Sequence, residues 1–303
     1  MRISIIWTIL IGVILFAFAA TFSVADDKAQ TDRLRVFVGI LPQAYIVEQV
    51  GGDIVKVGVL IGPGQSPETF DPTPKDIIRL FEIDAYFQIG LPFETRLIQK
   101  ASDLVDNFNV VDTRLGITLR TISDHHHGDF IHQGETDPHI WLDPELLKIQ
   151  AQTICHELSR LRPNHTGLFE ANLKVLETRL DLVDSTVADL LAPLNGAGFF
   201  VFHPSYGYFA DRYGLKQVAV ETGGKEPGAH HLTELIEEAR RENISAIFIQ
   251  PQFSTKTAEA IAHEIDSRIV ILDPLARNCV DNLETMARDI FKVLNTDNKG
   301  VSE

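Results

Sequence analysis

LFEANLKVLETRLDLVDSTVADLLAPL, residues 168–194, carries apolar residues three and four positions apart along its whole length. This spacing places the apolar side chains on one face of an α-helix. No Gly or Pro interrupts the run before Pro193, so it predicts one helix of about seven turns, long for a globular protein. The break at residues 195–198 then ends it.

Short apolar runs alternate with amphipathic segments on both sides of this helix. The runs that we expect to be strands are residues 35–40, 54–61, 84–90, 109–112, 199–202, 216–220, 245–250 and 268–272. Strands that alternate with helices at this spacing predict right-handed βαβ units and parallel sheets. We therefore expect an α/β protein with two lobes, each a parallel sheet flanked by helices. The expected bounds are 33–165 and 195–296 for the lobes and 166–194 for the linking helix, with a ligand cleft between the lobes.

Composition excludes several classes of protein. Lys and Arg number 27 against 42 Asp and Glu, which gives a formal net charge of −15. Phosphate backbones repel such a chain, so we expect no nucleic-acid partner. The two cysteines, Cys155 and Cys279, are too few for a disulfide-rich scaffold, an all-cysteine zinc site or an iron–sulfur cluster.

The N-terminus is typical of a secretory signal peptide. Arg2 is followed by an uncharged apolar run over residues 3–25, which ends in Ser23-Val24-Ala25. We predict cleavage after Ala25 and a periplasmic location, where the two thiols are able to pair if they lie close together. The alternative is an uncleaved membrane anchor, because the run is long enough to span a bilayer.

Polar residues at predicted strand ends form a candidate metal site. His203 follows the strand 199–202, and Asp273 follows the strand 268–272. Glu68 lies in the loop after the strand 54–61, and His139 lies in DPHIWLDP, residues 137–144. Ligands of open parallel sheets bind at the carboxyl ends of strands, so these four side chains can converge on one cleft. Two imidazoles and two carboxylates suit a divalent cation and leave the bound site neutral.

Each of these residues also has a plain structural interpretation. His139 and His203 can be core histidines with satisfied hydrogen bonds, and Asp273 can cap the turn before Pro274. Asp71 is the alternative to Glu68 as the first ligand. A second cluster, His125 to His127 with His132, lies in the polar loop 123–137, where metal capture and simple solvation both remain open.

The segments around the four candidates resemble those of a known family. Residues 66–74 (SPETFDPTP), 137–144 (DPHIWLDP), 202–209 (FHPSYGYF) and 272–275 (LDPL) are similar to the metal-ligand motifs of the periplasmic zinc- and manganese-binding proteins of ABC importers. Residues 224–227 and 251–254 also look like family segments, and the resemblance covers about residues 34–295. It implies two α/β lobes, a backbone helix, a metal bound between the lobes by Glu68, His139, His203 and Asp273, and delivery to a membrane permease.

The departures from the family pattern bear on the choice of metal. The family usually has histidine where this chain has Glu68, and often glutamate where it has Gln250. Manganese-binding members tend to carry glutamate where this chain has His203, and zinc-specific members tend to carry a His-rich loop at the position of residues 123–137. We therefore expect Zn²⁺, with Mn²⁺ or Fe²⁺ as the alternative.

Enzyme motifs are incomplete in this chain. His156 and His263 are each followed by glutamate but lack the second histidine of a zincin, and the P-loop lysine motif is missing from the sequence. We expect a monomeric binding protein without catalytic activity. The rival is an extracytoplasmic metallohydrolase that uses Glu221 or Glu226 as general base, and a third alternative is an adhesin-like surface protein of the same fold.

Overall fold

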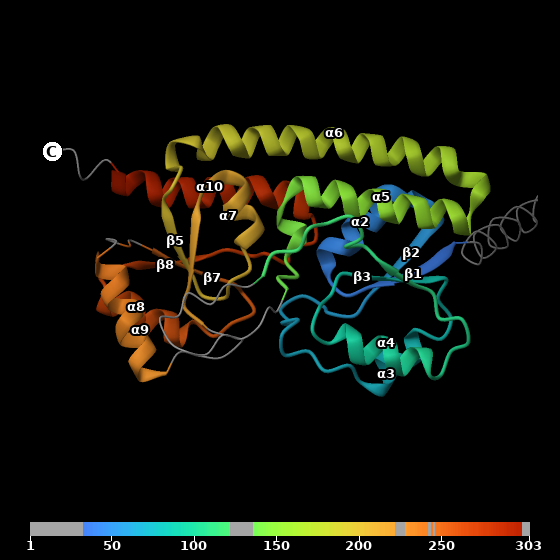
Figure 1. Ribbon diagram of the computed structural model, residues 1–303, viewed down its shortest axis with the longest axis horizontal. Helices are drawn as coiled ribbons and strands as arrows, with labels where there is room; N and C mark the ends of the chain where they lie inside the picture. The colour runs from blue at the N-terminus through green and yellow to red at the C-terminus, as the bar shows by residue number, and fades with distance from the viewer. Residues whose placement is uncertain (1–32, 122–135, 222–227, 242–243, 245, 299–303) are drawn as a thin grey trace, which may run out of the picture.

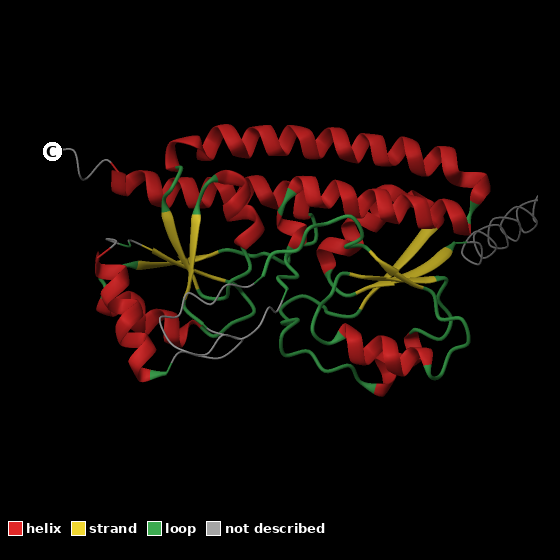
Figure 2. Cartoon of the chain, viewed as in Figure 1, coloured by secondary structure: helices red, strands yellow, loops and turns green. Residues whose placement is uncertain are grey.

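A computed structural model describes residues 33–121, 136–221, 228–241, 244 and 246–298. It contains two parallel four-stranded sheets, each flanked by helices, with a long helix that runs past both (Figures 1 and 2). The α/β fold expected from the sequence is thus confirmed. The predicted signal peptide (residues 1–25), the histidines of the 123–137 loop and Glu226 lie outside the described residues. Among the described helices, none combines the length and the apolar character that a membrane span requires.

The first sheet has the strand order β2-β1-β3-β4, with every neighbouring pair parallel. Its elements are β1 (Leu34–Val38), α2 (Leu41–Gly51), β2 (Val55–Val59), α3 (Pro74–Arg79), β3 (Ala85–Gln88), α4 (Glu94–Ser102), β4 (Val110–Asp112), the short 3₁₀ turn η2 (Ile140–Leu142) and α5 (Pro144–Leu161). Helix α3 begins with a capping box at Thr73, whose hydroxyl accepts a hydrogen bond from the Asp76 N–H while Thr73 N–H donates to the Asp76 carboxylate.

The second sheet repeats the plan, with the strand order β6-β5-β7-β8. Its elements are β5 (Gly198–Val201), α7 (Gly207–Tyr213), β6 (Lys216–Ala219), α8 (Ala229–Arg241), β7 (Ala246–Ile249), α9 (Thr255–Glu264), β8 (Arg268–Ile271) and α10 (Cys279–Asn298). Because all strands are parallel, their carboxyl ends share one edge, where His203 and Asp273 follow β5 and β8.

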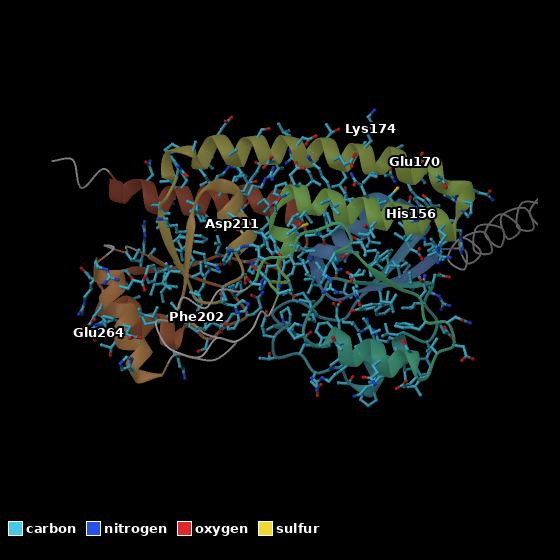
Figure 3. The ribbon with its side chains drawn as sticks, in the orientation of Figure 1. His156, Glu170, Lys174, Phe202, Asp211 and Glu264 are labelled. Atoms are coloured by element: carbon cyan, nitrogen blue, oxygen red, sulfur yellow. The ribbon has the colours of Figure 1, made fainter. Side chains whose placement is uncertain are left out.

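The long helix α6 (Thr166–Leu191) joins the two lobes along one side of the molecule (Figure 1). Its inner face is fully buried at Leu180, Val183 and Val187, while Glu170 and Lys174 are exposed on its outer side (Figure 3). Helices α2, α5 and α10 all pack against it. One apolar core therefore runs from the first sheet through α6 and α10 into the second sheet, and a smaller core lies between the second sheet, α8 and α9.

Helix α10 begins against α2 of the first lobe and runs back along α6 over the second lobe (Figure 1). The Sγ atom of Cys279, at its start, lies 3.8 Å from the Pro42 carbonyl oxygen of α2, and Arg277 Nη2 lies 2.5 Å from Glu48 Oε1 of the same helix. Cys155 and Cys279 are both buried free thiols, so the possible disulfide is not formed. Burial raises the pKa of Cys279 to about 12, which keeps this thiol protonated and unreactive at neutral pH.

A buried carboxylate fixes the turn after β3. Glu94 is 2% exposed, and its Oε2 accepts hydrogen bonds from the backbone N–H groups of Ile89 (3.1 Å), Gly90 (2.6 Å) and Leu91 (2.8 Å). Its Oε1 accepts from the Tyr86 hydroxyl at 2.8 Å. Burial raises the pKa of Glu94 to about 7, although these hydrogen bonds oppose the shift. This single side chain thus satisfies a turn whose donors would otherwise be buried without partners.

Candidate metal centre

Three of the four predicted ligands meet between the lobes. His203 Nε2 lies 3.1 Å from Glu68 Oε1 and 3.3 Å from His139 Nε2, and His139 Nε2 lies 3.9 Å from Glu68 Oε1. Around a tetrahedral zinc ion with bonds of about 2.0–2.1 Å, neighbouring ligand atoms are about 3.3 Å apart. The three observed separations therefore bracket the spacing that one zinc ion requires. Of the described residues, only these three form such a group.

His139 is oriented by the segment that carries it. It precedes η2, and Asp137 Oδ1 accepts its backbone N–H at 2.9 Å and lies 2.8 Å from its Nδ1. The carboxylate therefore fixes the Nδ1–H tautomer and turns Nε2 toward Glu68 and His203. The ring is 4% exposed and lies beside Trp141, at 5.1 Å between ring centroids. Water is thus largely excluded from this side of the centre.

His203 is held by residues that follow two other strands of its sheet. Its Nδ1 hydrogen-bonds the Glu221 carboxylate after β6, and its backbone N–H and carbonyl both pair with the Gln250 side chain after β7. Its ring stacks on Phe253 at 5.3 Å between centroids. Burial lowers the pKa of His203, but the hydrogen bonds and charges of Glu221 and Glu68 outweigh it and raise that pKa to about 9.

Glu68 lies on the loop between β2 and α3 and is more accessible, with a side chain 19% exposed. One oxygen, Oε1, faces the two imidazoles, and the other, Oε2, accepts a hydrogen bond from the Ser66 hydroxyl. Burial raises the pKa of Glu68, yet the hydrogen bond and charge of His203 overcome it and lower the pKa to about 2. The carboxylate is therefore ionised throughout the physiological range.

An arginine at the seam links the His139 segment to the second lobe. Arg120 Nη1 lies 3.3 Å from Asp137 Oδ2, and its Nε lies 2.7 Å from Asp211 Oδ2 on α7, labelled in Figure 3. Tyr208 adds a bridge, because its hydroxyl accepts from the Arg120 N–H and donates to the Asp137 carbonyl. Gly207 leaves the room for this, since a Cβ there would lie 1.4 Å from Arg120 Nη1.

Asp273 lies outside the group of three. Its Oδ1 accepts hydrogen bonds from the Leu275 N–H at 2.9 Å and from Gln252 Nε2 at 3.1 Å. The same loop reaches the centre nonetheless, because Trp141 Nε1 donates to the Pro274 carbonyl at 2.7 Å. Asp273 lines a neighbouring cavity of about 250 Å³ that opens between the lobes, together with Gln252 and residues of the 61–65 loop.

The donor set suits a soft-to-borderline divalent cation. Two imidazoles and a carboxylate are common zinc ligands, and here they surround a hollow of about 10 Å³, the size of one small ion or water. The carboxylates of Asp137 and Glu221 lie behind the imidazoles, fix their orientation and add negative charge near the centre. The arrangement can therefore hold a cation without further rearrangement of these three side chains.

Sequence reasoning missed the orienting roles of two carboxylates. Asp137 lies within the quoted DPHIWLDP segment, two residues before His139, a spacing that allows an Asp to bond the backbone and ring of the histidine. The sequence suggests Glu221 only as the general base of a hydrolase, yet it follows β6 at the same sheet edge as His203. That shared edge was the available signal.

Comparisons with known proteins agree with this geometry. The family model described as zinc-uptake complex component A, periplasmic (ZnuA), matches residues 36–295. A high-affinity zinc uptake system protein ZnuA of Yersinia pestis is 28% identical over 81% of this chain and 84% of its own length. A putative metal-binding protein of Chlamydia trachomatis is 26% identical over 92% of this chain and 97% of its own.

Solved structures of ZnuA and TroA share the fold of this chain. A crystal structure of ZnuA has a TM-score of 0.80 and 38% identity, covering 86% of this chain and 99% of that one. A deletion variant of ZnuA with zinc bound has a TM-score of 0.79 and 39% identity, covering 86% and 98%. The periplasmic zinc-binding protein TroA of Treponema pallidum, 23% identical with a TM-score of 0.77 over 86% and 99%, shares the fold.

Proposed function

The chain belongs to the ZnuA family of periplasmic zinc-uptake components, and from this premise we propose that it captures Zn²⁺ outside the cytoplasm and delivers it to the membrane permease of an ABC importer. The observation that carries the proposal is the convergence of Glu68, His139 and His203 from both lobes on one point. Zinc is the cargo of this centre. The chain acts as a monomer without a nucleic-acid partner, and residues 1–25 serve as its signal peptide.

Asp273 completes the ligand set in this proposal. Its loop is tied to the His139 segment through Trp141 and to α10 through Asn282, whose Nδ2 donates to the Asp273 carbonyl at 2.7 Å. Two imidazoles and two carboxylates give four donors and a neutral zinc complex, which suits storage and transfer rather than catalysis at an open position. The two lobes, 33–165 and 195–296, then contribute two ligands each across the helix 166–194.

The metallohydrolase alternative lacks its base among the described residues. The Glu221 carboxylate is hydrogen-bonded to His203 Nδ1. It therefore orients a metal ligand and does not face an attacking water. Manganese remains the alternative cargo. Two nitrogen ligands favour zinc, since manganese prefers sites made of oxygen.

A zinc titration tests the proposed function. The purified chain, stripped with a chelator, is titrated with Zn²⁺ against a competing indicator, and its metal content after purification without added metal is measured by elemental analysis. We expect one zinc per chain at high affinity. A protein that retains no zinc and competes with no indicator does not have this function.

Replacing Asp273 by alanine tests the fourth ligand. We expect Asp273→Ala to weaken zinc binding roughly ten- to a hundredfold, because one of four donors and one of two charges are lost. The matched control is Asp53→Ala, an exposed acid in the turn after α2. Equal zinc affinity of Asp273→Ala and the control removes Asp273 from the ligand set.

Zinc affinity should depend on pH through His203. Because its pKa is raised to about 9, the imidazole is protonated at neutral pH and must lose a proton to bind zinc. The apparent affinity should rise by about tenfold per pH unit up to pH 9 and then level off. Calorimetry in buffers of different ionisation enthalpy should find about one proton released per zinc at pH 7.5.

The raised pKa of His203 has the opposite consequence for the stability of the metal-free protein, which should fall as pH rises. A raised histidine pKa stabilises the fold fully below the unfolded value of about 6.5, and this contribution disappears as pH rises through 9. Melting temperature in a chelator should therefore fall over this range. Glu221→Gln weakens the hydrogen bond that is the largest cause of the raised His203 pKa, and it should move this pH range to lower values. If the melting temperature of Glu221→Gln falls over the same pH range as that of the wild type, Glu221 does not raise the pKa of His203.

A further inference from the structure

In each of the two carboxylates of the proposed ligand set, Glu68 and Asp273, one oxygen already accepts a hydrogen bond from the protein. Glu68 Oε2 accepts from the Ser66 hydroxyl, while Oε1 faces both imidazoles. Asp273 Oδ1 accepts from Gln252 Nε2 at 3.1 Å and from the Leu275 N–H at 2.9 Å. One oxygen of each group thus remains for a metal.

We propose that Ser66 and Gln252 set the choice of metal by confining Glu68 and Asp273 to one metal-ligating oxygen each. This inference rests on the proposed function and on the ligand set named there. A polarised O–H or N–H hydrogen beside a carboxylate oxygen repels a cation that approaches the same oxygen. The donor also withdraws electron density that the metal would otherwise share.

The confinement fixes the number of donor atoms. With Nε2 of His139 and of His203, and one oxygen from each carboxylate, the protein offers four donors, the number that zinc takes in tetrahedral sites. Manganese favours octahedral, oxygen-rich surroundings, which two bidentate carboxylates would bring within reach because they would raise the number of donors to six. The hydrogen bonds of Ser66 and Gln252 prevent this bidentate coordination.

Both donors are built into the loops that carry the ligands. Ser66 lies two residues before Glu68, and its Oγ also accepts the Glu68 N–H at 3.3 Å, so the hydroxyl is fixed by a local turn. Gln252 follows β7, and with Leu275 it lines the same hollow as the three meeting ligands. Since Oδ1 has two lone pairs, Gln252 and Leu275 together use both.

The test compares zinc and manganese affinities in the full chain. Ser66→Ala, Gln252→Leu and the double variant are titrated with each metal against a competing chelator. The matched controls are Ser185→Ala and Gln152→Leu, exposed residues whose side chains also donate hydrogen bonds but lie on α6 and α5. Ser66→Thr keeps a hydroxyl and should keep the wild-type preference.

We expect the double variant to reduce the preference for zinc over manganese by about tenfold, with each single variant in between. X-ray absorption should find four-coordinate zinc in the wild type and a higher manganese coordination number in the double variant. Equal losses for both metals, or an unchanged ratio, would show that the two donors only hold the loops and would overturn the proposal. Failure of the proposed function looks different, since the wild type would then bind neither metal.

Discussion

His203→Ala should weaken zinc binding on the order of a hundred- to a thousandfold and leave the protein folded. A four-ligand zinc site contributes roughly 10–16 kcal/mol, so one donor carries about 2.5–4 kcal/mol. His203 is the closest of the three to both others, at 3.1 Å and 3.3 Å, and it brings the Glu221 carboxylate with it. Competition titration measures the loss, and circular dichroism in a chelator checks the fold.

The matched control for this variant is His230→Ala. That imidazole is 90% exposed at the start of α8 and is paired with Glu234 four residues later. Its removal should leave zinc affinity unchanged. If His203→Ala bound zinc as tightly as His230→Ala, the convergence of three side chains would not be the binding site, and the proposed function would lose its main support.

Glu94→Ala should cost about 3–5 kcal/mol of unfolding free energy, the second large effect that we expect. The change removes a buried acceptor from the Tyr86 hydroxyl and from three backbone N–H groups of the turn 89–91. Water cannot replace the carboxylate without opening the core around β3. Urea unfolding in a chelator measures the loss without a contribution from bound metal.

Two further variants separate this effect from the loss of any glutamate. Glu82→Ala removes a carboxylate that is 77% exposed and pairs with Arg35 at 2.8 Å, so it should cost less than about 1 kcal/mol. Glu94→Gln keeps an acceptor oxygen and most of the volume, and it should be less destabilising than Glu94→Ala. A Glu94→Ala variant as stable as Glu82→Ala would show that the turn does not depend on this carboxylate.

Much of the fold was predictable because its signals are local. The apolar period of α6, the capping box at Thr73 and the proline that starts α5 are read from neighbouring residues. Helix α2 is harder to predict because it contains the buried Gln43, which accepts a hydrogen bond from the Gly39 N–H and donates one to the distant Phe87 carbonyl. A polar residue inside the core breaks the apolar period that prediction relies on.

From the sequence it was possible to predict that certain polar residues near strand ends lie in one cleft, but not which contacts orient them. Glu68, His139 and His203 were placed in one cleft by the rule for parallel sheets, and the structure brings them together. The position of Asp273 depends on the amide of Gln252, and the orientation of His203 depends on Glu221. Such contacts join separate strands, so they follow from three-dimensional packing that no local pattern encodes.

Helix α10 starts against α2 and runs along α6 over the second lobe, so neither half of this chain is a self-sufficient module. A fragment cut after residue 194 would lose the helix that seals its apolar flank, and the remainder would expose the surface of α10 that it normally presents to α6. Chimeras built by joining halves of two homologous carriers should therefore assemble only when α2, α6 and α10 come from the same parent.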